Sequence, residues 1–170
     1  SNFTPKVRAI RNILKQWSRR KLSLKGKIVV INALALSLIV YPLTVLETPD
    51  GLLEELNQIL YTFLWDGKRP KIAAKVLEST IFKGGLKMPN IFLKVQAWQF
   101  SWLKRAFQNT KSSWVITINA ILKTIDFTDL LHYHKSNIHF IKLLPAFYGK
   151  ILATWFKLKE TFGKNEILNE

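Results

Sequence analysis

An uncharged stretch of 19 residues, positions 28–46, constrains the fold of this chain more than any other feature. A helix of that length is at the lower edge of what spans a bilayer. Asn32, Ser37 and Thr44 interrupt the stretch with polar side chains. Pro42 should kink or end a helix about four residues before the stretch ends. We therefore expect a buried core helix on which amphipathic helices pack, with a membrane span as the alternative.

The N-terminal segment predicts an amphipathic helix. Thr4 supplies a hydroxyl for the N-cap, and Pro5 suits the first helical position, where its missing N–H costs nothing. Ser23 is a second candidate N-cap, directly before the uncharged stretch. Within the first helix, apolar residues recur at spacings of three and four and so share one face: Val7, Ile10, Leu14 and Trp17.

A well-bounded helix is expected to open at 48–50 and to close at Asp66-Gly67, where the glycine suits a left-handed backbone. Glu54 and Glu55 fall near its positive N-terminal end, where carboxylates are favoured. Residues 72–77 are ambiguous between a short helix and a strand, because their apolar run is too brief for periodicity to decide.

Glycine and proline mark the boundaries in the second half of the chain. Gly84-Gly85 predicts a turn with unusual backbone angles, and Pro89 predicts the start of a helix whose apolar face continues to Ala106. Farther on the signals weaken. A helix is expected at 114–123, a turn or cap at 126–129 and a final helix at 151–162.

Together these patterns predict a mainly α fold. We expect a helical bundle with a short irregular or β-hairpin-like connection, followed by a helical C-terminal part. The two parts are expected at residues 1–107 and 108–170. With 48% hydrophobic residues, the chain has enough apolar material to build a core.

The formal net charge of +15 favours a polyanionic partner such as RNA, DNA or an anionic membrane. This charge is unevenly distributed. Residues 1–27 contain nine basic side chains and no acidic one, and residues 66–94 contain seven basic side chains against Asp66 and Glu78. Because solvated helix faces ordinarily mix signs, the local excess indicates a surface that follows phosphates.

The sequence lacks a recognisable set of catalytic residues. No acidic pair on a strand is predicted that could hold two metal ions, and residues 25–27 lack the other members of a phosphate-cradling loop. The chain has no cysteine. His132, His134 and His139 are an alternative metal site, with polar turn residues as the default. We expect no enzyme activity of the chain alone, no metal and no cofactor.

The first 27 residues contain no apolar segment of the kind found in a signal peptide. The absence of cysteine also fits a reducing compartment. An intracellular protein, in the nucleus or cytoplasm, is therefore expected.

Five short segments carry a resemblance to a known family. They are Leu22-Ser23-Leu24-Lys25-Gly26-Lys27-Ile28, Tyr41-Pro42, Phe63-Leu64-Trp65, Lys71-Ile72-Ala73 and Gly84-Gly85-Leu86. In this order and spacing they resemble the helical thumb that follows the palm in reverse transcriptases of LINE-type (non-LTR) retrotransposons. The resemblance covers about residues 10–107. Residues 108–170 match no motif and would correspond to the connecting region beyond the thumb.

The resemblance implies nucleic-acid binding. A thumb grips the template–primer duplex by its backbone, while the metal-binding aspartates of the family lie in the palm. The chain begins at Ser1 instead of Met, so a fragment of a longer RNA-directed DNA polymerase is expected. Its partners would be an RNA/DNA hybrid or template–primer duplex and the remainder of the polymerase, with no small molecule. The expected contacts are Arg8, Arg11, Lys15, Arg19, Arg20, Lys21, Lys25, Lys27, Lys68, Arg69 and Lys71.

Two other classes remain open at this stage. The uncharged stretch beside a basic flank also suits a membrane-associated helical protein. Trp98, Phe100 and Trp102 would suit a module that docks on a protein partner, such as the missing palm, if they are exposed. Trp17 and Trp65 lie on apolar stripes and are expected to anchor the core, not to stack on bases.

Overall fold

The computed structural model describes residues 2–123, 126–130, 132 and 138–162. Over these residues the chain forms helices joined by turns, with no strand, which confirms the mainly α fold. Its contacts divide it into two compact units, Ser1–Val95 and Gln96–Glu170. The sequence-based expectation was a boundary at 107/108, and the division by contacts falls inside helix α6 (Ile91–Gln108). Each unit is described separately.

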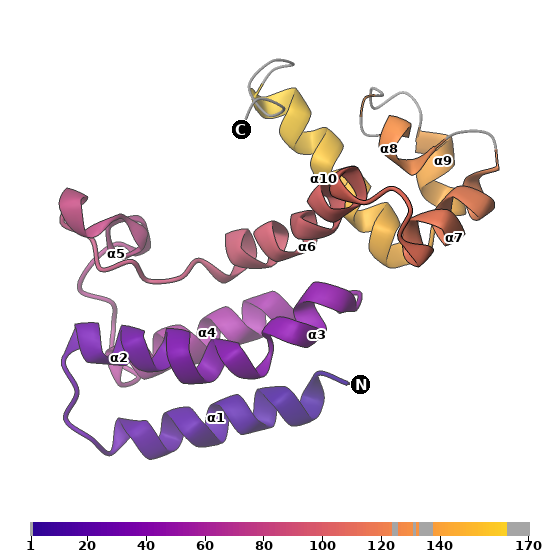
Figure 1. The fold of residues 1–170 in the computed structure, drawn as a ribbon. Helices are drawn as coiled ribbons and strands as arrows, with labels where there is room; N and C mark the ends of the chain where they lie inside the picture. The colour runs from indigo at the N-terminus through magenta and orange to yellow at the C-terminus, as the bar shows by residue number, and fades with distance from the viewer. Residues whose placement is uncertain (1, 124–125, 131, 133–137, 163–170) are drawn as a thin grey trace. The chain divides into compact units, whose positions relative to one another are not determined.

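Four helices build the first unit: α1 (Thr4–Ser18), α2 (Leu24–Val30), α3 (Val40–Val45) and α4 (Leu52–Trp65) (Figure 1). The predicted stripe on α1 is buried at Val7, Ile10 and Leu14. The predicted hydroxyl cap is wrong, because Thr4 is already helical and Phe3 occupies the N-cap position without a side-chain hydrogen bond.

The uncharged stretch buries one face, at Ile31, Ala35 and Leu43, while Val29 and Tyr41 are exposed, and it is not one helix. After α2 it continues as a π-helix, Ile31–Ala35, and a 3-10 turn, Leu36–Leu38, before α3 begins. Ser23 caps α2 as predicted, since its Oγ accepts the Gly26 N–H at 3.2 Å. The chain bends at Ile39, where φ is −118°.

Pro42 explains where the uncharged stretch bends. It lies in the first turn of α3, where a missing N–H is tolerated, so the helix continues through it to Val45. The bend therefore precedes the proline, whereas the sequence predicted a kink or an end at the proline itself. Among the described residues, no helix is both long and apolar enough to cross a membrane.

Helix α4 begins later than its sequence signal suggests. Its N-cap is Gly51, with φ of 77° and no side-chain cap, although Glu54 and Glu55 lie in the first turn as predicted. At the other end Asp66 and Gly67 are both left-handed, and the Gly67 N–H donates to the Thr62 carbonyl at 2.9 Å. This Schellman-type closure satisfies an orphan carbonyl and turns the chain out of the bundle.

The connection from α4 to α6 is irregular. It contains α5 (Ala74–Glu78), which resolves the ambiguity of that segment, and the 3-10 turn Ile81–Lys83. Backbone N–H groups of Leu86 and Met88 donate to the Leu77 carbonyl at 3.1 and 2.9 Å. These bonds fold the segment back on itself without forming a strand.

Glu78 ties this connection to its neighbours. Its carboxylate accepts hydrogen bonds from the Tyr61 hydroxyl at 3.3 Å and the Asn90 amide at 3.1 Å. Burial, with the adjacent Glu78 charge, raises the pKa of Tyr61 to about 12. The phenol therefore stays protonated and remains a donor over the physiological range.

Gly85 gives a direct test of this turn. A Cβ at Gly85 would lie 2.1 Å from the Ser79 carbonyl oxygen, whereas a Cβ at Gly26 in α2 would meet only ordinary contacts, the nearest at 3.5 Å. We expect Gly85→Ala to lower the free energy of unfolding by about 1–3 kcal/mol through overpacking. Gly26→Ala should leave it unchanged or raise it by up to about 1 kcal/mol. Urea unfolding of both variants measures the difference, and equal stabilities would contradict the described turn.

The second unit packs the later part of α6 with α7 (Ser113–Leu122), α8 (Phe127–Leu130), α9 (Ile138–Leu143) and α10 (Ala146–Phe162). The predicted turn at 126–129 is largely a short helix, and the final helix begins directly after Pro145. The core of the second unit contains Leu144 and residues of α6, α7, α8 and α10. Among them are Leu103, Ala106, Val115, Phe127 and Leu152.

The aromatic residues that motivated the docking alternative lie against this second core. The Phe100 ring packs edge-on to Trp155 at 6.1 Å, and Trp102 packs edge-on to Trp114 at 5.2 Å. Trp98 is half-buried. Phe100 and Trp102 are therefore only partly exposed, because both pack against this core.

Candidate nucleic-acid interface

Two basic segments, distant in sequence, begin at the same end of the helix pair α1 and α4. Helices α1 and α4 run side by side in the same direction, and a groove of about 770 Å³ between them is lined by Ser18 at the end of α1 and by Asp66 and Gly67 at the end of α4. The connection 19–23 follows α1, and the loop 66–73 follows α4. Both basic segments therefore begin where these two helix C-termini lie together.

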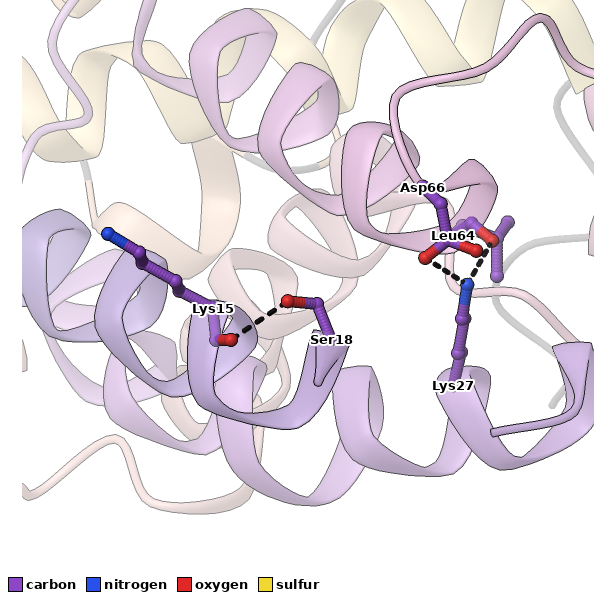
Figure 2. A network of polar contacts seen from close by, with 5 residues as sticks. All are labelled: Lys15, Ser18, Lys27, Leu64 and Asp66. Carbon is purple, nitrogen blue, oxygen red and sulfur yellow. Dashed lines mark hydrogen bonds and ion pairs between the residues drawn. The ribbon is translucent and has the colours of Figure 1, made fainter. Parts of the chain in front are cut away.

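Lys27 fixes α2 to this end of the bundle. Its Nζ lies 2.6 Å from the Asp66 Oδ1 and donates to the Leu64 carbonyl at 3.2 Å (Figure 2). Leu64 is in the last turn of α4, where carbonyls lack helical partners, so Lys27 acts as a C-terminal cap from a neighbouring helix. This cap brings the start of α2 next to the loop after α4.

The result is a surface that we call the basic end. It combines seven cationic side chains, all exposed: Arg19, Arg20, Lys21, Lys25, Lys68, Arg69 and Lys71. Residues 19–25 and 67–71 contain no acidic side chain. The nearest carboxylate, Asp66, is paired with Lys27. The formal charge of the basic end is therefore +7, one for each member.

Helix dipoles alone do not account for this concentration of charge. Cations are favoured beside helix C-termini, and two such termini lie here. Each terminus is equivalent to only about half an elementary charge. About one negative charge in total thus stands against seven cations, and the dipole interaction fades within the last turn. Most of the positive charge is left to face solvent.

Three further predicted contacts follow α1. Arg8, Arg11 and Lys15 are exposed and lie on one side of the helix, at spacings of three and four. Arg11 donates to Glu55 at 2.9 Å, but both side chains are about half exposed. An exposed pair of this kind contributes little stability, so Arg11 can exchange the carboxylate for a phosphate.

Lys27 is the exception among the eleven predicted contacts. It is only 6% exposed, and its ammonium is held by Asp66 and Leu64. The structure therefore does not favour the predicted contact of Lys27 with nucleic acid, because reaching a phosphate would take the buried ammonium away from Asp66 and the Leu64 carbonyl. Its spacing contained the signal: Lys27, Ile31 and Ala35 recur every four residues and are all buried.

Lys94, another member of the basic cluster at 66–94, also has a structural contact. Its Nζ donates to the Asn32 side-chain oxygen at 3.0 Å. Burial lowers the pKa of Lys94 from its ordinary value. This lysine belongs to the packing of α6 on the uncharged stretch and not to the basic end.

The two tryptophans near the basic end are half-buried, as core anchors that reach the surface would be. The Arg20 guanidinium lies over the Trp17 ring, 4.3 Å from its centre. This cation–π contact steadies a long side chain that would otherwise lose entropy on binding. The Trp65 indole N–H is buried and has no hydrogen-bond partner among the described residues.

No group of three or more histidine or acidic side chains that could hold a metal ion lies in the described part of the chain. His132 is exposed and lies beside the Phe107 ring. His134 falls outside the described residues, and only the backbone of His139 is described. No protein-family model and no solved structure matches the chain.

Sequence reasoning missed one fully exposed aromatic residue of the first unit, Phe82. It occupies the 3-10 turn between α5 and Gly84, and its side chain is 99% exposed. The available signal was its position between Thr80 and Lys83, directly before a glycine turn and away from any apolar stripe.

Proposed function

We propose that this chain binds an RNA/DNA hybrid by its phosphate backbone, as the thumb and following region of a LINE-type reverse transcriptase. The observation that carries the proposal is the basic end, in which two segments separated by more than 40 residues combine seven exposed cations without an acid. The ordered segments that resemble the family's thumb support the same function. The chain alone would be non-catalytic, and its other partner would be the palm and fingers of an intracellular polymerase.

The arrangement suits recognition of backbone shape, not base sequence. From Arg8 to Arg19 the helical rise of about 1.5 Å per residue gives a track of about 16 Å. That length corresponds to about five base pairs along one strand. The exposed cations lie on α1, on α2 and in two loops, where they can reach phosphates, so they would position a duplex without reading its bases.

A salt series tests this proposal. If six to ten of the exposed cations contact phosphates, affinity for a hybrid should fall by about 10³- to 10⁵-fold between about 50 and 200 mM salt. Fluorescence anisotropy of a labelled hybrid measures the slope. A second hybrid with a permuted sequence should bind equally. A flat response to salt, or a strong preference for one sequence, would contradict backbone binding.

Neither rival class is supported by an observation of the structure. The uncharged stretch that suggested a membrane protein packs one face into the first unit, where Ile31, Ala35 and Leu43 are fully buried, and none of the described helices is long and apolar enough to cross a membrane. Of the aromatic residues that suggested protein docking, Phe100 and Trp102 pack against the core of the second unit. Backbone binding of nucleic acid therefore remains the function best supported.

A further inference from the structure

The segment between α4 and α6 presents one fully exposed aromatic side chain on a well-defined turn. Phe82 is 99% exposed, and its neighbour Ile81 is 56% exposed. The turn itself is closed by hydrogen bonds from the Gly84 N–H to the Ile81 carbonyl and from the Gly85 N–H to the Thr80 carbonyl, at 3.0 and 2.9 Å. The missing Cβ of Gly85 allows the backbone to press against Ser79.

This turn is anchored to the bundle on both sides. Leu77 and Met88, before and after it, are 1% and 2% exposed. The Glu78 carboxylate between them is bound by Tyr61 and Asn90. Phe82 is therefore held in solvent by an ordered turn. Phe82 and its exposed neighbour Ile81 together hold apolar surface in water, and covering that surface is favourable.

The charges around Phe82 indicate what covers it. Exposed lysines flank the turn at Lys75, Lys83 and Lys87, and the segment follows in sequence from Lys68, Arg69 and Lys71 of the basic end. Over residues 67–87 there are six bases against one acid, Glu78, a formal charge of +5. That acid is already bound by Tyr61 and Asn90. The charge pattern fits a polyanion.

We propose that Phe82 stacks on an unpaired base of the strand that extends beyond the hybrid, while Lys83 and Lys87 contact its phosphates. An aromatic ring beside cations is the combination by which proteins hold single strands without reading their sequence. Helix α5 has only five residues, far shorter than the amphipathic helices that lie in a membrane surface. The inference rests on the proposed function and adds a single-stranded partner next to the duplex.

The stacking proposal is tested with two hybrids that share the same duplex. One hybrid is blunt, and the other has a single-stranded template overhang that contains 2-aminopurine next to the junction. Phe82→Ala should weaken binding of the overhang hybrid by about 5- to 150-fold, the range for loss of one stacked base. It should leave the blunt hybrid and the salt slope unchanged. Phe82→Trp should retain binding and quench the 2-aminopurine.

The controls separate the possible failures. Leu93→Ala removes another exposed apolar side chain of the first unit, 63% exposed, and should leave both affinities unchanged. Equal binding of the overhang hybrid by Phe82→Ala and the original chain would overturn the stacking proposal while the duplex proposal stands. Failure of the original chain to bind either hybrid would overturn both. Phosphatidylserine vesicles bound by the original chain but not by Phe82→Ala, with hybrid binding unchanged, would overturn stacking in favour of a membrane surface.

Discussion

Reversing three charges at the basic end, Arg19→Glu, Arg20→Glu and Lys21→Glu together, should weaken hybrid binding by at least about 10³-fold at about 50 mM salt. Each phosphate contact contributes a factor of about 15 between about 50 mM and 1 M salt, from a slope of about 0.9 per contact. Three lost contacts therefore remove about three orders of magnitude before any repulsion is counted. The slope itself should fall by about 2.7 or more. Anisotropy across the salt series measures both quantities.

A matched variant distinguishes a local surface from general attraction by a basic chain. Lys104, Lys111 and Lys142 are exposed in the second unit, and their change to Glu alters the net charge by the same six units. We expect this control to weaken binding by less than tenfold. Helicity should be unchanged in both triple variants, because all six side chains are exposed. Equal losses from the two triples would contradict a defined interface.

The parts of this fold that the sequence predicted are those decided by local chemistry. The Ser23 cap and the Gly67 closure depend on a few neighbouring residues, and both are confirmed. The breaks within the uncharged stretch were not predictable in the same way. A continuous apolar run carries no periodicity, so it does not reveal where a π-helix and a 3-10 turn replace the α-helix.

The candidate site, like the uncharged stretch, could be predicted from the sequence only in part. Exposure of ten of the eleven predicted cations follows from their charge, since lysine and arginine are almost never fully buried unless paired. Residues 19–25 and 67–71 meet because α1 runs parallel to α4 and because Lys27 joins α2 to the end of α4. The sequence of either segment alone does not predict this packing. The exposure of Phe82 likewise depends on the turn that holds it.

Loss of the Asp66 charge should be the most destabilising change at this end of the bundle. Asp66→Asn keeps a side chain that tolerates the left-handed backbone, φ 52°, but removes the partner of a buried ammonium. We expect the free energy of unfolding to fall by about 3 kcal/mol, the lower end of the range for a broken buried pair. The lower end applies because Asp66 is 55% exposed and water screens the interaction. Urea unfolding followed by circular dichroism measures the change.

Three further variants complete this test: Lys27→Met, Arg11→Met and the double variant Lys27→Met/Asp66→Asn. Lys27→Met leaves only the Leu64 carbonyl unsatisfied, because Asp66 can be hydrated, so a loss of about 1–2 kcal/mol is expected. The double variant should be no less stable than Lys27→Met by more than about 0.5 kcal/mol. Arg11→Met breaks the exposed pair with Glu55 and should cost less than about 1 kcal/mol.

The variant Asp66→Asn also tests whether the Lys27–Asp66 pair is needed for binding at the basic end. If the Lys27–Asp66 pair holds the two basic segments together, Asp66→Asn should also weaken hybrid binding, although it removes a negative charge. Pure electrostatics predicts the opposite sign, since deleting an acid beside seven cations should strengthen attraction to phosphate. Tighter binding by Asp66→Asn would therefore show that the basic segments do not need this pair to bind. Weaker binding by Asp66→Asn, with hybrid binding unchanged in the Leu93→Ala control, would show that the Lys27–Asp66 pair positions the surface.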